Sequence, residues 1–281
     1  MAQNLQQIKK RIKTSQNIFQ IAKAMEMIAT SKIRKAQLSV ERYNPFADKI
    51  IYIVNKILAD KDLNEGIEKF ASEKSGAKLV FIVAPDKGLC GGLVVNLFKK
   101  AVSYIKPDDF VITVGKKAAQ AAPRNNFNIL YHFNMGTNFP KFEDIFPMIK
   151  TATKFYLSGE VTGISIVYTE FKNMLIQTAQ VKEILPIERD KNFVDNGIDY
   201  IMEPSGIQVL ENLIPYYLEV GFYDAFMNSY ASEQAARMTA MKNAKDNAEE
   251  ISASLENIYN RSRQEKITNE LLDLANGQQG M

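Results

Sequence analysis

Residues 5–28 of this 281-residue chain read LQQIKKRIKTSQNIFQIAKAMEMI, and this stretch sets the architecture of the protein. Apolar residues recur at steps of three and four from Leu5 to Ala22, with Ser15 in one of the slots, which is the pattern of an amphipathic helix. Residues 5–57 contain no glycine and a single proline, Pro45, where we expect a bend. A helix over residues 1–57 would be about 85 Å long at roughly 1.5 Å per residue, which is too long for the inside of a compact domain.

The C-terminal part of the chain predicts a second long helix. It begins at Ser205, whose side chain can cap the first turn together with Gln208 three residues later. It continues to about residue 275, with interruptions expected at Pro215 and Gly221. Apolar and small residues follow alternating steps of three and four and predict a heptad seam: Met241, Ala244, Ala248, Ile251, Leu255 and Ile258.

The two terminal helices are expected to pair as a long antiparallel coiled coil. Residues 1–57 hold eleven basic and three acidic residues, whereas residues 232–276 hold eight acidic and six basic ones, so their charges are complementary. If residue 57 lies beside residue 208, Leu5 meets Asn260, and the helix beyond Asn260 projects alone. A basic helix also suits nucleic acid, an anionic membrane surface or an acidic protein, and charge alone does not choose among them.

Residues 77–190 predict a central Rossmann-like α/β domain inserted between the two helices. Strands are expected at 78–84, 110–114 and 127–133, helices at 93–105, 116–122 and 139–157, and a hairpin of strands 163–170 and 177–185 at one edge of the sheet. The fold class is therefore α/β. The expected divisions are an N-terminal coiled-coil helix at 1–57, a linker at 58–76, the central domain at 77–190, a return segment at 191–204, and the C-terminal helix with its projecting tip at 205–281.

The composition excludes several classes of site. Cys90 and His132 are the only residues of their types, so we expect neither a disulfide framework nor a metal cage built from His and Cys. A buried inert thiol is a better interpretation of Cys90 than a nucleophile, because His132 is the only imidazole that could activate it. No apolar run is long enough to cross a membrane as a helix, and no cleaved export signal is expected.

Residues 86–93, DKGLCGGL, follow the first predicted strand and open a helix, which is where α/β sheets often bind phosphate. The segment lacks the Lys-Ser/Thr ending of a P-loop and the glycine spacing of a dinucleotide fingerprint. A structural tight turn is therefore favoured over a nucleotide site. The residues of this central loop are Asp86, Gly88, Cys90, Gly91 and Gly92, and no catalytic residue and no metal ligand is predicted.

Several motifs resemble those of the gamma subunit of rotary F-type ATP synthases. Residues 23–32, KAMEMIATSK, resemble its N-terminal signature, and residues 86–93 resemble its central loop. Residues 231–238, ASEQAARM, resemble the start of its C-terminal signature, which continues in residues 259–261, YNR, and 267–271, ITNEL. The matches occur in the order of the family and touch both ends and the middle of the chain.

The resemblance implies a shaft, not itself an enzyme, that turns inside a hexamer of alpha and beta ATPase subunits. The shaft would couple rotation to ATP synthesis or hydrolysis and to proton translocation, while ATP, ADP and Mg²⁺ would be bound by the partner subunits. Implied partners also include an epsilon-like subunit and a membrane-embedded ring, but no nucleic acid, and the implied location is peripheral, at the cytoplasmic face of the cell membrane. The coupling positions of the family fall on Met25, Arg237, Arg263, Gln264, Thr268 and Glu270.

Departures from the family pattern leave a second function open. Ser262, Glu265 and Lys266 interrupt a run of small residues at the tip, which allows a gamma-like shaft in an ATP-driven motor that is not coupled to proton flow. A nucleic-acid-binding coiled coil is less favoured, because it leaves the acidic second helix and the motifs unexplained. In a proton-driven rotor, the foot that grips the membrane ring is expected at Gly221 and Asp224, near a bend at Pro215.

Overall fold

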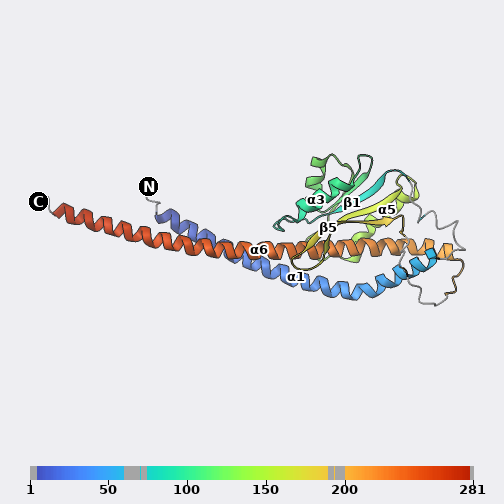
Figure 1. Ribbon diagram of the computed structural model, residues 1–281, viewed down its shortest axis with the longest axis horizontal. Helices are drawn as coiled ribbons and strands as arrows, with labels where there is room; N and C mark the ends of the chain where they lie inside the picture. The colour runs from blue at the N-terminus through green and yellow to red at the C-terminus, as the bar shows by residue number, and fades with distance from the viewer. Residues whose placement is uncertain (1–4, 60–69, 71–74, 189–192, 194–199, 279–281) are drawn as a thin grey trace. The chain divides into compact units, whose positions relative to one another are not determined.

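The computed structural model describes residues 5–59, 70, 75–188, 193 and 200–278, with side chains described up to residue 272. The chain forms two compact units, one of residues 1–30 with 237–281 and one of residues 31–236. The first unit is a pair of helices, and the second is built around a sheet (Figure 1). Most of the predicted linker at 58–76 and of the return segment at 191–204 lies outside the described residues.

Two long helices begin and end the described chain, close to the predicted bounds. Helix α1 spans Leu5–Ala59 and helix α6 spans Gly206–Gln278. At the start of α6 the Gln208 backbone amide donates a hydrogen bond to the Ser205 hydroxyl at 3.4 Å, which is the geometry of the predicted cap.

The interruptions expected in the second helix were wrong. Pro215 and Gly221 both lie inside the continuous helix α6, and Pro45 lies inside α1. A proline removes one backbone hydrogen bond, and a helix that is held by tertiary packing on both sides of the proline can lose that bond without ending.

Five strands form one mixed sheet in the order β3-β2-β1-β4-β5. Their bounds are β1 Lys78–Val83, β2 Phe110–Val114, β3 Asn128–Phe133, β4 Gly163–Phe171 and β5 Gln177–Leu185. Strands β3, β2, β1 and β4 run parallel, and β5 pairs antiparallel with β4. The predicted hairpin of the last two strands at one edge of the sheet is confirmed, with β4 pairing against β1 and β5 forming the outer strand.

Helices cover both faces of the sheet, which confirms the α/β class. The helices between the strands are α3 Leu93–Tyr104, α4 Lys116–Ala121 and α5 Phe146–Leu157. Alternate residues of β1 point to opposite faces, as the period of a strand requires. One face packs against α3 and α4 through Val80, Ile82, Val111, Leu97 and Ala118. The other face packs against α5 and α6 through Phe81, Val83, Ile112, Met148 and Phe222.

Gly221 allows α6 to approach the edge strand closely. A Cβ at this position would lie 2.7 Å from Cδ1 of Ile184 on β5. One turn later Asp224 forms an ion pair with Lys182, which is also on β5. Both residues thus take part in the contact between α6 and the sheet, and their role as a foot for a membrane ring stays a prediction.

Thr169 on β4 carries a buried hydroxyl that makes no hydrogen bond with any described residue. Its backbone is well paired, since the Ser232 hydroxyl donates to the Thr169 carbonyl at 3.0 Å. We expect Thr169→Val to keep these backbone contacts and to raise the free energy of unfolding by roughly 1 kcal/mol, because the change removes an unpaired polar group. Urea denaturation measures the effect. Thr169→Ser, which keeps the hydroxyl and loses the methyl group, should destabilise, and a loss of stability in Thr169→Val would contradict the expectation.

Candidate functional site

A buried seam runs along the pair formed by residues 5–30 of α1 and residues 237–272 of α6. On α1 the buried positions recur every seven residues, at Ile8, Ser15, Ala22 and Ala29. On α6 they recur at Met241, Ala248 and Leu255. This repeat is the heptad of a coiled coil, and the small residues in it allow the two helices to approach closely.

The second position of two of the three predicted heptads on α6 differs from the prediction, whereas Ala244 is half-buried as expected. Ile251 and Ile258 were expected in the seam, but both are exposed. Ser252 and Tyr259, one residue later in each case, are half-buried in their place. Isoleucine is more hydrophobic than serine or tyrosine, so the sequence pattern placed Ile251 and Ile258 in the seam instead of Ser252 and Tyr259.

Polar contacts across the seam fix the direction of pairing. The Ser15 hydroxyl donates to the Ala248 backbone carbonyl at 2.7 Å, and the Lys245 ammonium donates to the Glu26 carboxylate at 2.9 Å. Later residues of α1 thus meet earlier residues of α6, which confirms the antiparallel arrangement. The predicted register placed Ser15 opposite residue 250, two residues from its observed partner, so the register is confirmed to within about one helical turn.

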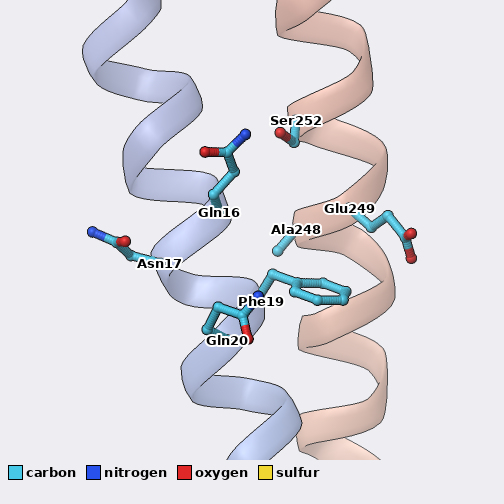
Figure 2. Close-up of a pocket in the computed structure, with 7 residues that line it drawn as sticks. All are labelled: Gln16, Asn17, Phe19, Gln20, Ala248, Glu249 and Ser252. Atoms are coloured by element: carbon cyan, nitrogen blue, oxygen red, sulfur yellow. The ribbon is translucent and has the colours of Figure 1, made fainter.

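A groove of about 510 Å³ opens beside this seam (Figure 2). The Phe19 ring extends toward α6 next to Ala248, and Gln16 faces Ser252 across the groove (Figure 2). The groove exists because alanine and serine on α6 are too small to fill the space that Phe19 leaves beside it. The walls combine one aromatic ring with amide and hydroxyl groups, so the groove offers a mixed apolar and polar surface.

The outer surface of the helix pair is apolar in stripes and basic between them. Within residues 5–30 of α1 the exposed large apolar residues are Ile18, Ile21, Met27 and Ile28, and on α6 they include Ile251 and Ile258. Exposed cations stand nearby on α1, at Lys9, Lys10, Arg11, Lys13 and Lys23. Exposed apolar side chains in such number are typical of a surface that contacts other proteins.

The end of α6 forms a single-helix tip. Every described side chain from residue 263 to residue 272 is exposed. Local contacts follow the helix, with the Thr268 hydroxyl donating to the Gln264 carbonyl at 2.9 Å and Lys266 pairing with Glu270 at 3.6 Å. Such contacts add little to stability, so the tip is available for a partner.

The residues that the family resemblance assigns to coupling are spread along the helix pair. Met25 is half-buried and Arg237 is 8% exposed, whereas the four assigned residues of the tip are exposed. The structure brings Gln264 and Thr268 together by a hydrogen bond. Arg237 and Arg263 are about 39 Å apart along one helix at roughly 1.5 Å per residue, so the six residues do not form one cluster. Their role in coupling stays a prediction.

The central loop is tied to the carboxyl ends of three strands. The two carboxylate oxygens of Asp86 accept hydrogen bonds from the Lys116 backbone amide at 2.8 Å and from the Gly136 backbone amide at 2.9 Å. These amides belong to the segments that follow β2 and β3, and Asp86 itself follows β1. Cys90 is buried, and Gly91 adopts a φ of 58°, the left-handed region that glycine favours. The carboxylate of Asp86 is therefore engaged in joining loops, and the role of this loop in an assembly stays a prediction.

Sequence reasoning missed the pair of Glu26 and Lys245. The pair links the two helices, and each side chain is 22% exposed. The hydrogen bond from Lys245 to Glu26 raises the pKa of the Lys245 ammonium above its ordinary value. The sequence held one sign of this pair, because Glu26 is the only acidic residue among the first 40 and stands out in a basic helix.

Two kinds of feature are absent from the described residues. Within the part of the chain that the structure describes, no helix is long and apolar enough to cross a membrane. The same residues contain no group of three or more His, Cys, Asp or Glu side chains that could hold a metal ion.

Comparisons with known proteins give a consistent result across the chain. Residues 4–281 match a family model described as ATP synthase. The ATP synthase gamma chain of Dehalococcoides mccartyi (strain CBDB1) is 36% identical over 279 residues, which cover 98% of each chain. The ATP synthase gamma chain of Clostridium novyi (strain NT) is 35% identical over 275 residues, which cover 97% of this chain and 96% of the relative.

Solved structures with a similar fold come from Euglena gracilis mitochondrial ATP synthase. The structure of the rotor in rotational state 1 matches with a TM-score of 0.66 and 17% identity, covering 94% of this chain and 98% of the other. The structure of OSCP, F1 and the c-ring in rotational state 3 matches with a TM-score of 0.70 and 19% identity, covering 99% of this chain and 94% of the other. At these identities the likeness supports the fold alone.

Proposed function

This chain belongs to the ATP synthase gamma family, and on that basis we propose that it is the central rotor shaft of an F-type ATP synthase. Its helix pair turns inside a hexamer of alpha and beta subunits and couples rotation to ATP synthesis or hydrolysis. The chain is a subunit of an ATPase complex, and catalysis belongs to the hexamer, whose subunits bind ATP, ADP and Mg²⁺.

The observation that carries this proposal is the helix pair with its single-helix tip. A rotating shaft must be stiff, and the heptad seam supplies this stiffness. It also needs an outer surface that contacts the surrounding hexamer. The exposed isoleucines at positions 18, 21 and 251 supply apolar contact area on that surface. The exposed lysines between them suit acidic segments of the hexamer.

Five of the six residues assigned by resemblance are exposed or half-buried, as the proposed contact with the hexamer requires. Gln264, Thr268 and Glu270 lie on the exposed tip, where a partner can reach them. Met25 lies further along the pair, where it would meet a different part of the hexamer, whereas Arg237 is 8% exposed and would offer the hexamer little surface. An asymmetric shaft of this kind would make chemically identical catalytic sites differ from one another as it turns.

A membrane-embedded ring and an epsilon-like subunit are the further partners that we propose for the sheet-containing unit, at the cytoplasmic face of the membrane. Ile201 is 92% exposed, next to the exposed Tyr200. Both residues line a pocket of about 430 Å³ together with Ile53 and Val209. This surface is a second candidate contact with the ring, beside Gly221 and Asp224.

The first test concerns catalysis. The pure chain should hydrolyse no ATP, and hydrolysis should appear when the chain is reconstituted with the alpha and beta subunits. A coupled colorimetric phosphate assay measures both states. Turnover by the pure chain that persists after removal of all hexamer subunits would contradict the assignment of catalysis to the partners.

The second test separates a proton-driven rotor from an uncoupled motor. A coupled rotor should co-purify with a small membrane ring subunit, and its ATP hydrolysis in vesicles should acidify the lumen. A complex that lacks the ring and hydrolyses ATP at the same rate with and without a protonophore would favour the motor. Both functions keep the shaft inside the hexamer, so the helix pair does not distinguish them.

A further inference from the structure

The seam of the helix pair repeats every seven residues, so its apolar pattern does not by itself specify one register. Ser15, Ala22 and Ala29 face a helix that contributes Met241, Ala248 and Leu255. A shift of the two helices by one heptad would move Ser15 from Ala248 to Met241 or Leu255, so each seam position would again face an apolar residue. The heptad pattern is therefore compatible with a shifted register as well as with the native one.

The hydrogen bond of Ser15 does not remove this degeneracy. Its acceptor is the backbone carbonyl of Ala248, and every residue of α6 has a carbonyl. After a shift of seven residues, Ser15 could donate to the carbonyl of another residue in the same way. The contact satisfies a buried hydroxyl, but it does not select one register.

The pair of Glu26 and Lys245 does distinguish the registers. Their charged atoms are 2.9 Å apart, and both side chains are 22% exposed. A shift by seven residues would bring Met238 or Ser252 to the place of Lys245 and leave a half-buried carboxylate without its cation. Few acids could replace Glu26, since it is the only acidic residue in the first 40 of the chain.

We propose that Glu26 and Lys245 are positioning residues that fix the axial register of the helix pair. Through that register they fix the axial position of Met25, the neighbour of Glu26, relative to Arg237 on the other helix. The inference rests on the proposed function for its consequence in the rotor, because Met25 is a proposed contact with the hexamer and the resemblance assigns both residues to coupling. If one helix slipped along the other, these residues would lie at the wrong axial position and the rotor would lose coupling.

The test compares Glu26→Lys, Lys245→Glu and the double swap in the full chain. Register is read from disulfide cross-linking of cysteines at Ile12 and Ser252, which report the native register. A second pair at Ile12 and Tyr259 reports a shift by one heptad. Each single variant should lower the ratio of native to shifted cross-link by about fivefold, in line with a partly exposed ion pair. The double swap should restore the ratio, because it restores the pair with reversed charges.

Ser15→Ala is the matched control. It removes a polar contact of the same seam and should lower the melting temperature while leaving the cross-link ratio unchanged. Single charge variants that keep the wild-type ratio, or a double swap that fails to restore it, would overturn the proposal. A shift of register in Ser15→Ala as large as in the charge variants would also overturn it.

The assembled complex gives the second readout. Protons pumped per ATP hydrolysed should fall in the single charge variants and recover in the double swap, while Ser15→Ala keeps the wild-type ratio. Failure of every variant and of the wild type to assemble with a hexamer would count against the proposed function. The cross-link ratios would still decide whether the pair sets the register, so the two failures are distinguishable.

Discussion

Gly115→Ala is expected to unfold the sheet-containing unit. Gly115 follows β2 with a φ of 89°, and a Cβ at this position would lie 1.9 Å from the Ala84 carbonyl oxygen. The clashing oxygen belongs to the backbone of Ala84, and this backbone is held in place because the Ala84 amide donates to the Val114 carbonyl at 3.0 Å. Relief of the clash would also cost the hydrogen bond from the Gly115 amide to Phe133 at 2.8 Å. We expect a loss of about 4 kcal/mol or more in the free energy of unfolding.

Tyrosine fluorescence during urea denaturation reports this unit, because every tyrosine except Tyr259 lies in residues 31–236. Gly136→Ala is the control for backbone conformation alone. Gly136 has a φ of 78°, and a Cβ there would meet nothing within 4 Å. Its substitution should cost only about 1 kcal/mol. Equal losses at Gly115 and Gly136 would show that strain, and not the clash with Ala84, limits the first position.

Phe222→Ala should produce the second large loss, by releasing α6 from the sheet. Phe222 is fully buried, and its ring lies edge-on to that of Phe81, with centroids 4.9 Å apart and planes at 81°. Removal of a buried ring leaves a cavity and deletes an aromatic pair, and we expect a cost of about 3 to 5 kcal/mol. Urea denaturation of the full chain measures it.

Ile201→Ala is the matched comparison for Phe222→Ala. It also truncates a large apolar side chain, but Ile201 is 92% exposed, so the change should alter stability by less than about 0.5 kcal/mol. If Phe222→Ala costs as little as Ile201→Ala, α6 is not anchored to the sheet through this ring.

The long helices and the α/β class could be predicted because they depend on periodic patterns. The stretch without glycine near the N-terminus and the cap at Ser205 fixed the helix bounds closely. Complementary charge and the length of the seam gave the register, which the contact of Ser15 with Ala248 confirmed.

Other features depend on contacts between distant segments, which a pattern along one segment does not contain. Gly221 looked like a helix breaker, but its missing side chain makes room for Ile184 on β5. The loop that contains Asp86 was expected to be a structural turn, but the partners of its carboxylate, amides 30 and 50 residues away, could not be read from the sequence. The pairing of Glu26 with Lys245 required the register before it could be recognised.

The exact spacing of seven residues in the seam has a mechanical consequence. An undistorted α-helix has 3.6 residues per turn, so a seam that repeats every seven residues stays in contact only if the two helices wind around each other with a left-handed supercoil. A left-handed coiled coil responds differently to the two directions of twist, because one direction winds the two helices tighter and the other unwinds them. The helix pair therefore stores elastic energy unequally under clockwise and anticlockwise torque, and its stiffness depends on the direction in which it is driven.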